Sequence, residues 1–298
     1  MKIVRVESLI YGVEDVGAGI RYYEDWGLSC IEKGANGAEF KLPSGQSIVI
    51  RPASDAALPP APDGGSTLRE AIWGVEDVAS LDAIGKELAR DREVKPDARG
   101  GLHARDEAGY AIGFRPVSKG SKPGAAEASR MNRPFDPERR ARPKRIGHIV
   151  YNIPKSGIEK VLAFYLERLK FRLTDRALDT GAFMRCAGST DHHNLFFATR
   201  YDQPSFNHAA FEVKDIDEII LGGKYMKSRG WVANTPVGRH ILGSNLFWYF
   251  NNPCGGRTEY YADMDQMDDN WKPRIWEKNP GFAMWMLDKA DAPELSRI

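Results

Sequence analysis

Apolar and polar positions alternate along the chain in a way that predicts short strands followed by amphipathic helices. From Arg145, the stretch RIGHIVYN has the composition of a strand, and apolar residues at positions 158, 161, 162, 165 and 169 then follow the helical period. Ser156 and Glu159 have the spacing of a capping box at the start of this helix. The pattern predicts a strand, a turn and a helix.

The same layout occurs four times. The segment RVESLIYGVEDVGAGIRYYEDWGL, from Arg5, resembles the one from Arg145, and TLREAIWGVEDVASLDAIGKEL, from Thr67, resembles SFNHAAFEVKDIDEIILGGKYM, from Ser205. Short strand-like runs such as AEFKLPSG, NLFFATR and LFWYF lie between and after the helices. We therefore predict an α+β fold of two tandem domains, each built from two βαβββ modules that form a curved mixed sheet.

A chain of 298 residues fits two domains of ordinary size. The stretch 118–143 is rich in Lys, Arg, Pro, Ser and Ala and has no sustained apolar period, so it is predicted to be a linker. The predicted bounds are 1–117 for the first domain, 144–265 for the second and 266–298 for a Trp-rich tail. Three roles are open for the tail: it covers a pocket mouth, pads a subunit contact or packs on the sheet.

Composition excludes several partner classes. Lys and Arg number 42 against 41 Asp and Glu, which does not favour a nucleic-acid partner. The three cysteines are scattered, which favours a reducing compartment over a disulfide framework. No leader-like start and no long apolar run is present, so we expect a cytoplasmic protein with no membrane partner.

Histidine is scarce and unevenly placed. Of six histidines, five lie between positions 148 and 240, within the second predicted domain. When the two halves are aligned, His148 stands opposite Ser8 and His208 opposite Glu70, while Glu259 stands opposite Gly113, so the first domain is predicted to lack a metal site. The framework repeats, but this set of side chains occurs once.

His148, His208 and Glu259 fall on three different predicted strands, and same-face positions of a curled sheet converge. Two imidazoles and one carboxylate form the facial triad that holds Fe(II) and leaves coordination positions open. A catechol fills two such positions and dioxygen a third. Taken singly, a histidine at a strand start is more often structural; the three together, absent from the sister half, favour a metal centre.

The segment HILGSNLFWYFNNPCGGRTE, from His240 to Glu259, carries a recognisable signature of a His, an aromatic before Tyr, then Asn-Pro, Gly and Glu. By this motif the chain resembles the two-domain type I extradiol (meta-cleaving) catechol dioxygenases of the vicinal oxygen chelate superfamily, the glyoxalase/bleomycin-resistance/dihydroxybiphenyl-dioxygenase-like fold. The resemblance covers most of residues 1–262. It implies that His148, His208 and Glu259 are the iron ligands.

The resemblance also implies the activity: dioxygen cleaves the ring of a catechol-type compound at Fe(II), in aromatic catabolism. His193 resembles the acid–base catalyst, Tyr249 the donor to a substrate hydroxyl and His240 its neighbour. Departures at Trp248 and at Leu242-Gly243 put the surroundings of His240 and the substrate preference in doubt. Iron against manganese, the identity of the catechol and the oligomeric state stay open, although relatives commonly form homo-oligomers.

His192 and His193 are adjacent, so they point to opposite faces, and either can be the acid–base residue. Spacing to the following Asn-Leu-Phe-Phe favours His193, which leaves His192 as a substrate contact. Phe183, Phe206 and Trp248 are further candidates for contacts with an aromatic ring, and ordinary core packing is the alternative for each.

Two other functions are compatible with the same superfamily. One is a lyase or isomerase that uses a divalent metal, and the other is a metal-free module that sequesters an aromatic ligand. The many histidines near the predicted site argue against the lyase, and the intact ligand trio argues against the module. Bound metal and oxygen consumption distinguish the three.

Overall fold

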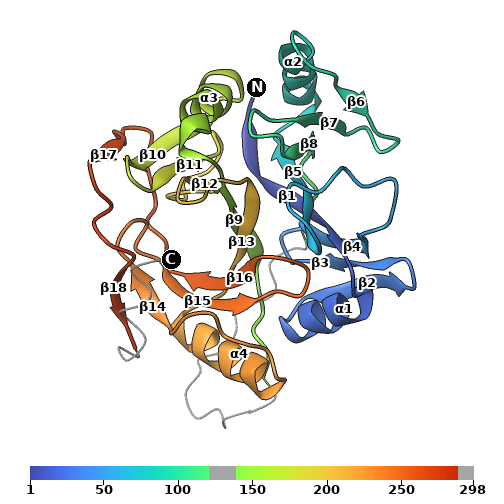
Figure 1. Ribbon diagram of the computed structural model, residues 1–298, viewed down its shortest axis with the longest axis vertical. Helices are drawn as coiled ribbons and strands as arrows, with labels where there is room; N and C mark the ends of the chain where they lie inside the picture. The colour runs from blue at the N-terminus through green and yellow to red at the C-terminus, as the bar shows by residue number, and fades with distance from the viewer. Residues whose placement is uncertain (121–138, 288–298) are drawn as a thin grey trace.

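Two mixed β-sheets organise the protein. The computed structural model describes residues 1–120 and 139–287 (Figure 1). The strand order is β2-β3-β4-β1-β5-β8-β7-β6 in the first sheet and β17-β10-β11-β12-β9-β13-β16-β15-β14-β18 in the second. The predicted fold is confirmed: four βαβββ modules follow one another along the chain, two in each sheet.

The first sheet takes its strands from two modules. Their elements are β1 (Ile3–Val13), α1 (Val16–Asp25), β2 (Ser29–Gly34), β3 (Gly37–Lys41) and β4 (Ser47–Pro52), then β5 (Thr67–Val75), α2 (Val78–Leu88), β6 (Lys95–Pro96), β7 (Leu102–Arg105) and β8 (Ala111–Pro116).

The second sheet repeats this plan and adds two strands. Its elements are β9 (Arg145–Asn152), the 3₁₀ turn η1 (Lys155–Gly157), α3 (Ile158–Ala163), the π-helical turn η2 (Phe164–Arg168), β10 (Arg172–Ala177), β11 (Gly181–Arg185) and β12 (Leu195–Ala198), then β13 (Ser205–Glu212), α4 (Ile216–Ser228), β14 (Gly238–His240), β15 (Leu246–Asn251) and β16 (Arg257–Ala262), followed by β17 (Arg274–Trp276) and β18 (Ala283–Met286).

Three of the four module helices begin at an aspartate. Asp15, Asp77 and Asp215 each accept a hydrogen bond from the backbone N–H three residues on, which satisfies an otherwise unpaired donor. The exception is α3, which starts after a 3₁₀ turn and has no side-chain cap. The predicted capping box there is wrong, because Ser156 lies inside the 3₁₀ turn.

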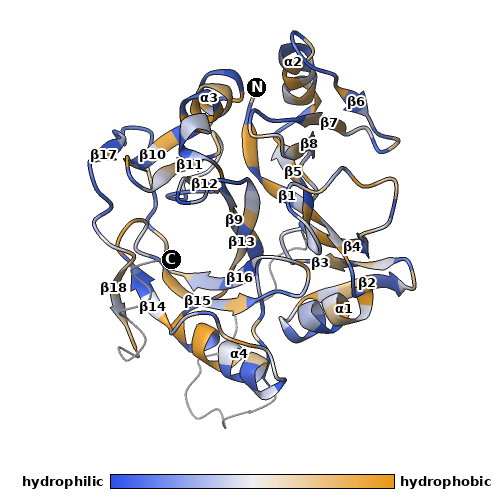
Figure 2. Cartoon of the chain, in the orientation of Figure 1, coloured by the Kyte–Doolittle hydropathy of each residue, from blue (hydrophilic) through white to orange (hydrophobic). Residues whose placement is uncertain are grey.

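A continuous apolar core joins the two halves. β1 and β9 lie next to each other near the middle of the molecule (Figure 1), and hydrophobic segments run along β1 and the helices (Figure 2). Trp26, at the end of α1, stacks on Tyr260 of β16 with ring centroids 3.5 Å apart, and Tyr22 hydrogen-bonds Thr258. Aromatic side chains of the first half thus hold the strand that carries Glu259.

The predicted linker at 118–143 falls largely on residues 121–138, which lie outside the described residues, as does the end of the tail from 288. The predicted domain bounds stay predictions. Part of the tail extends the second sheet, because β17 pairs in parallel with β10 and β18 pairs antiparallel with β14. No helix within residues 1–120 and 139–287 is long and apolar enough to cross a membrane.

Candidate metal centre and pocket

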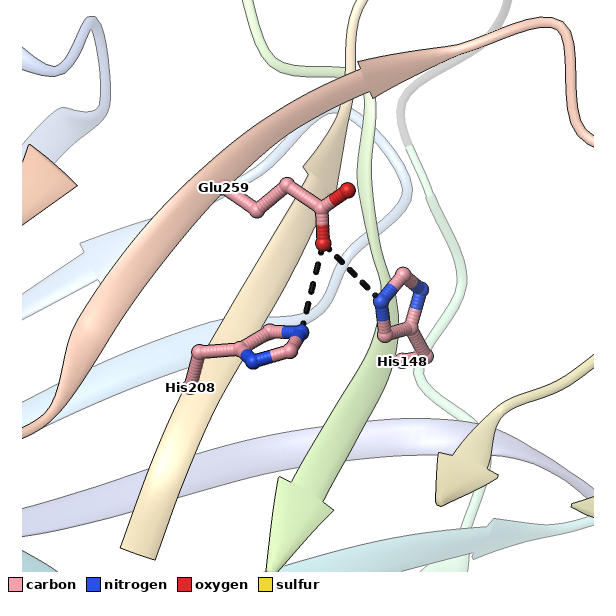
Figure 3. A group of neighbouring side chains, drawn as sticks. All are labelled: His148, His208 and Glu259. Atoms are coloured by element: carbon pink, nitrogen blue, oxygen red, sulfur yellow. Dashed lines mark hydrogen bonds and ion pairs between the residues drawn. The ribbon is translucent and has the colours of Figure 1, made fainter. Parts of the chain in front are cut away.

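Three adjacent strands bring the predicted ligands together. In the ladder across β9, β13 and β16, His148 pairs with Ala210 and Ala210 with Glu259, while His208 lies two residues from Ala210 along β13. A shift of two residues keeps a side chain on the same face of a sheet. Figure 3 shows the carboxylate of Glu259 directed at both imidazole rings.

The pairing register also confirms the alignment of the two halves. Ser8 pairs with Ile72, which pairs with Gly113, as His148 pairs with Ala210 and Ala210 with Glu259. Glu70 lies two residues from Ile72, as His208 lies from Ala210. In the first half Glu70 instead accepts a 2.7 Å hydrogen bond from His103, a residue whose place in the ladder corresponds to Tyr249.

The distances within the trio fit one metal ion. Glu259 Oε2 lies 3.1 Å from His148 Nε2 and 3.2 Å from His208 Nε2, and the three ligand atoms all lie within 4.8 Å of one another. Two ligands at right angles about a metal, each about 2.1 Å from it, are about 3.0 Å apart. His208 Nε2 is buried and has no well-aligned hydrogen-bond partner. The geometry and the donor types therefore suit a divalent metal.

Burial sets the charges of these groups. It lowers the pKa of His208 to about 4, against the opposing effect of Glu259. Burial alone would raise the pKa of Glu259, but hydrogen bonds with His148, His208 and His240 outweigh it and hold the pKa well below its usual range. A neutral imidazole and an ionised carboxylate are the forms that bind a metal ion. Asn245, fully buried, donates a 3.0 Å hydrogen bond to Glu259 Oε1.

A second group of predicted residues surrounds the trio. The ring of His193 lies 4.2 Å from that of His148, and the ring of Tyr249 lies 5.0 Å from that of His208. His240 Nδ1 is 2.9 Å from the carbonyl oxygen of Phe282, and its Nε2 is 3.0 Å from the hydroxyl of Tyr249. Because a carbonyl only accepts, Nδ1 donates to Phe282, and Nε2 shares the second hydrogen bond with the hydroxyl of Tyr249.

The pKa values of His193 and Tyr249, two buried side chains beside the trio, shift in opposite directions. Burial, together with the neighbouring His148 and His192, lowers the pKa of His193 well below its usual range. Burial and the charge of Glu259 raise the pKa of Tyr249 well above its usual range. Both side chains are therefore neutral near pH 7.

A pocket opens over this group. Its apolar wall contains Val150, Phe183, Phe196, Leu242 and Phe282, and its polar lining includes Thr180, Arg200, Tyr201, Asn207, Arg257 and Asn279. Phe183 and Phe196 stack with centroids 4.0 Å apart. The pocket is lined by His148, His193, His208, His240 and Tyr249, so predicted metal, catalytic and substrate residues meet in one place.

Three predicted substrate contacts, His192, Phe206 and Trp248, are absent from the residues that line the pocket. His192 is fully buried and turns to Asp175. Phe206 packs in the core against the rings of Tyr11 and Tyr151. The indole of Trp248 lies over α4 and donates to the carbonyl of Thr235, since successive residues of a strand face opposite sides and Tyr249 occupies the pocket side.

Sequence reasoning missed several residues of this site. Arg257 lies two residues before Glu259 on the same strand, so the strand period alone placed it on the pocket face. Asn279, Gly281 and Phe282 reach the pocket from the tail, and no local sequence signal marks them. Asn245 was equally unmarked.

Comparisons with known proteins agree with this description. Residues 145–260 match the family model of the Glyoxalase/Bleomycin resistance protein/Dioxygenase superfamily. Over 126 residues the chain is 36% identical to metapyrocatechase 2 of Cupriavidus necator, a stretch that covers 42% of this chain and 38% of that relative's length.

Solved structures extend the likeness to the whole fold. A Mn(II)-bound glyoxalase from Novosphingobium aromaticivorans superposes with a TM-score of 0.77 and 22% identity, covering 96% of this chain and 91% of that one. A halotolerant catechol dioxygenase superposes with a TM-score of 0.76 and 16% identity, covering 98% and 96%. The fold that the sequence pattern predicted is thereby confirmed.

Proposed function

We propose that this chain is an extradiol dioxygenase that opens the ring of a catechol-type compound with dioxygen, at Fe(II) held by His148, His208 and Glu259. One observation carries the proposal: two imidazole nitrogens and a carboxylate oxygen converge in a pocket with a largely aromatic and aliphatic wall. Mn(II) accepts the same ligands and is the alternative ion. A homo-oligomer in the cytoplasm remains our expectation.

Fe(II), when bound, supplies open coordination positions where the two oxygens of a catechol and dioxygen meet. The protein orients the substrate. Phe183 and Phe196 line one side of the pocket as a stacked pair, and such apolar faces suit a flat aromatic ring. The polar residues of the lining then select among rings by their substituents.

The protein also handles the substrate protons. The hydroxyl of Tyr249 lines the pocket and is hydrogen-bonded to His240 Nε2, so it can also exchange a hydrogen bond with a substrate hydroxyl. The role expected from the resemblance, in which Tyr249 donates to the substrate, stays part of the proposal. His193 is neutral and borders the pocket, so one of its ring nitrogens can take a proton from the second hydroxyl and return it to the product.

Oxygen consumption tests the proposal directly. Protein loaded anaerobically with Fe(II) is offered a panel of catechols, and we expect oxygen uptake together with a yellow ring-opened product. A parallel sample loaded with Mn(II) decides between the two ions. Metal retained with no oxygen uptake on any catechol would refute the proposal and favour the lyase or isomerase.

Ligand variants test the site. His148→Ala and Glu259→Ala should lose bound metal, measured by elemental analysis, and turnover together. His193→Phe should keep the metal and lose most of kcat, because general acid–base groups contribute about 10²–10⁴-fold. Metal loss in His193→Phe would mean that His193 is a ligand, and full activity in His148→Ala would exclude the proposed centre.

A further inference from the structure

Behind His193 lies a buried polar chain that the proposed chemistry does not yet use. His193 Nδ1 is 3.0 Å from His192 Nδ1, and His192 Nε2 is 2.7 Å from Asp175 Oδ2. Both Asp175 and His192 are completely buried. A carboxylate and an imidazole are costly to bury, so their pairing directly behind a pocket residue calls for an explanation.

Residues of the C-terminal tail hydrogen-bond Asp175, the last member of this buried hydrogen-bonded series. Arg274 donates from Nε to Asp175 Oδ1 at 2.8 Å and from Nη2 to Oδ2 at 2.7 Å, and the indole of Trp276 donates to Oδ1 at 2.8 Å. Burial raises the pKa of Asp175, but the hydrogen bonds from His192, Arg274 and Trp276 outweigh it and lower the pKa below its usual value. Asp175 is therefore an ionised, fixed acceptor.

This fixed acceptor determines where each ring carries its proton. An ionised carboxylate only accepts, so His192 must donate from Nε2. Arg274 already balances the charge of Asp175, so we assign His192 a single ring proton, the one that Nε2 donates to Asp175. Its Nδ1 then has a lone pair and accepts the proton of His193 Nδ1. The Nε2 of His193 is left unprotonated, as the ring nitrogen free of this contact.

We propose that Asp175 and His192 are positioning residues that hold His193 in the Nδ1–H tautomer and in one ring orientation, so that an Nε2 lone pair faces the substrate, and that the tail segment 274–276 is required for this. The inference rests on the proposed function, since it specifies how His193 is prepared to accept a substrate proton. It also gives the tail a role that is absent from the sequence pattern.

Asp175→Asn is the sharpest perturbation, because the side chain keeps its shape and loses one acceptor. The amide oxygen satisfies two donors when it faces Arg274 Nε and Trp276, at the Oδ1 position. Its NH₂ then occupies the Oδ2 position, where Arg274 Nη2 loses its acceptor and the amide donates to His192 Nε2. The direction of both hydrogen bonds is then reversed: His192 carries its proton on Nδ1, His193 accepts at Nδ1, and the proton of His193 moves to Nε2.

Imidazole nitrogen shifts report this reversal without any catalysis. We would label histidine with ¹⁵N, load the protein with diamagnetic Zn(II) and record long-range ¹H–¹⁵N spectra, assigning signals with His192→Gln and His193→Gln. The native protein should show Nε2–H on His192 and Nδ1–H on His193, and Asp175→Asn should exchange both. A native His192 protonated on both nitrogens, or unchanged tautomers in the variant, would overturn the inference.

Kinetics supply the second test, on protein that passes the oxygen-uptake assay. Asp175→Asn should lower kcat roughly a hundredfold, within the range of general acid–base catalysis, with bound metal and KM nearly unchanged. Asp106→Asn is the matched control, because Asp106 is also buried but hydrogen-bonds Tyr165 and backbone amides, none of which line the pocket. It should change stability and leave kcat alone.

The outcomes separate the two proposals. If no catechol is turned over but the tautomers exchange as expected, the proposed activity is refuted and the positioning role of Asp175 and His192 is supported. If the native enzyme is active and Asp175→Asn keeps its full kcat, the positioning role is refuted and the proposed activity is supported. An equal loss of kcat in Asp106→Asn would show a general effect of destabilisation and also refute the positioning role.

Discussion

Asn245 is the residue whose replacement tests most directly how the second sheet prepares the metal centre. Its amide donates a 3.0 Å hydrogen bond to Glu259 Oε1, the carboxylate oxygen that does not face both imidazoles. His240 Nε2 lies 3.7 Å from the same oxygen. In Asn245→Ala the oxygen Oε1 therefore loses the hydrogen bond from this amide, and the carboxylate is held less firmly in the position that faces His148 and His208.

The size of the effect follows from this loss. Partners that orient a metal ligand typically contribute 10- to 100-fold to metal affinity. We expect Asn245→Ala to bind Mn(II) roughly 10- to 100-fold more weakly, which is about 1.4–2.7 kcal/mol. Without metal, losing a hydrogen bond to a buried anion costs about 1.5–3 kcal/mol, partly offset because the amide oxygen of Asn245 is itself buried without a partner. The apo protein should therefore be slightly less stable.

The assay is an anaerobic Mn(II) titration in which electron paramagnetic resonance measures the free ion, with thermal unfolding recorded on the same samples. Asn252→Ala is the control, since this buried amide hydrogen-bonds Tyr23 and the backbone of Cys254 but not Glu259. It should lose stability and keep the native Kd. A Kd for Asn245→Ala within twofold of the native value would refute the idea that this amide positions the ligand.

Three further predictions concern stability. Trp26→Ala should destabilise the protein by about 3–5 kcal/mol in denaturant unfolding, because the ring is fully buried and stacks on Tyr260; a loss below 1 kcal/mol would show that the two halves do not depend on this contact. A hydrogen bond to Glu70 raises the pKa of His103, so its contribution is complete below the ordinary value of about 6.5 and is lost as pH rises through the raised pKa; Tm of the native protein should fall more steeply over that range than Tm of His103→Gln, and parallel curves would contradict this. Gly147→Ala places a methyl group 1.9 Å from the Tyr261 hydroxyl and should cost about 1–3 kcal/mol, part of which Tyr261→Phe should restore; strictly additive effects would count against the clash.

Much of the architecture could be predicted because each module repeats the same local signals. Period-2 runs gave the strands, helical spacing gave the helices, and the aspartates at positions 77 and 215 recur at the same place in matching modules. The candidate ligands could be singled out because histidine is scarce and because the two halves differ at these positions. That argument compares residue types and needs no coordinates.

Periodicity and residue type could not predict which residues of different modules contact one another. Phe206 and Trp248 have the composition of pocket residues, yet they face the core, because a strand's alternation gives two faces and does not say which one meets the ligand. The role of His192 depends on Asp175, 17 residues earlier, and Asp175 is held by Arg274, 99 residues later. No periodic signal links positions so far apart.

The sequence by itself therefore determined the repeated βαβββ plan, the half of the chain that carries the candidate metal ligands and the identity of those ligands, since these depend on local pattern and residue type. Only the tertiary structure decided how the ligands meet, through the register of β9, β13 and β16. It also decided which of two adjacent histidines faces the pocket. Residues of the tail line the same pocket, because strand pairing at the edges of a sheet brings together segments that are distant in the chain.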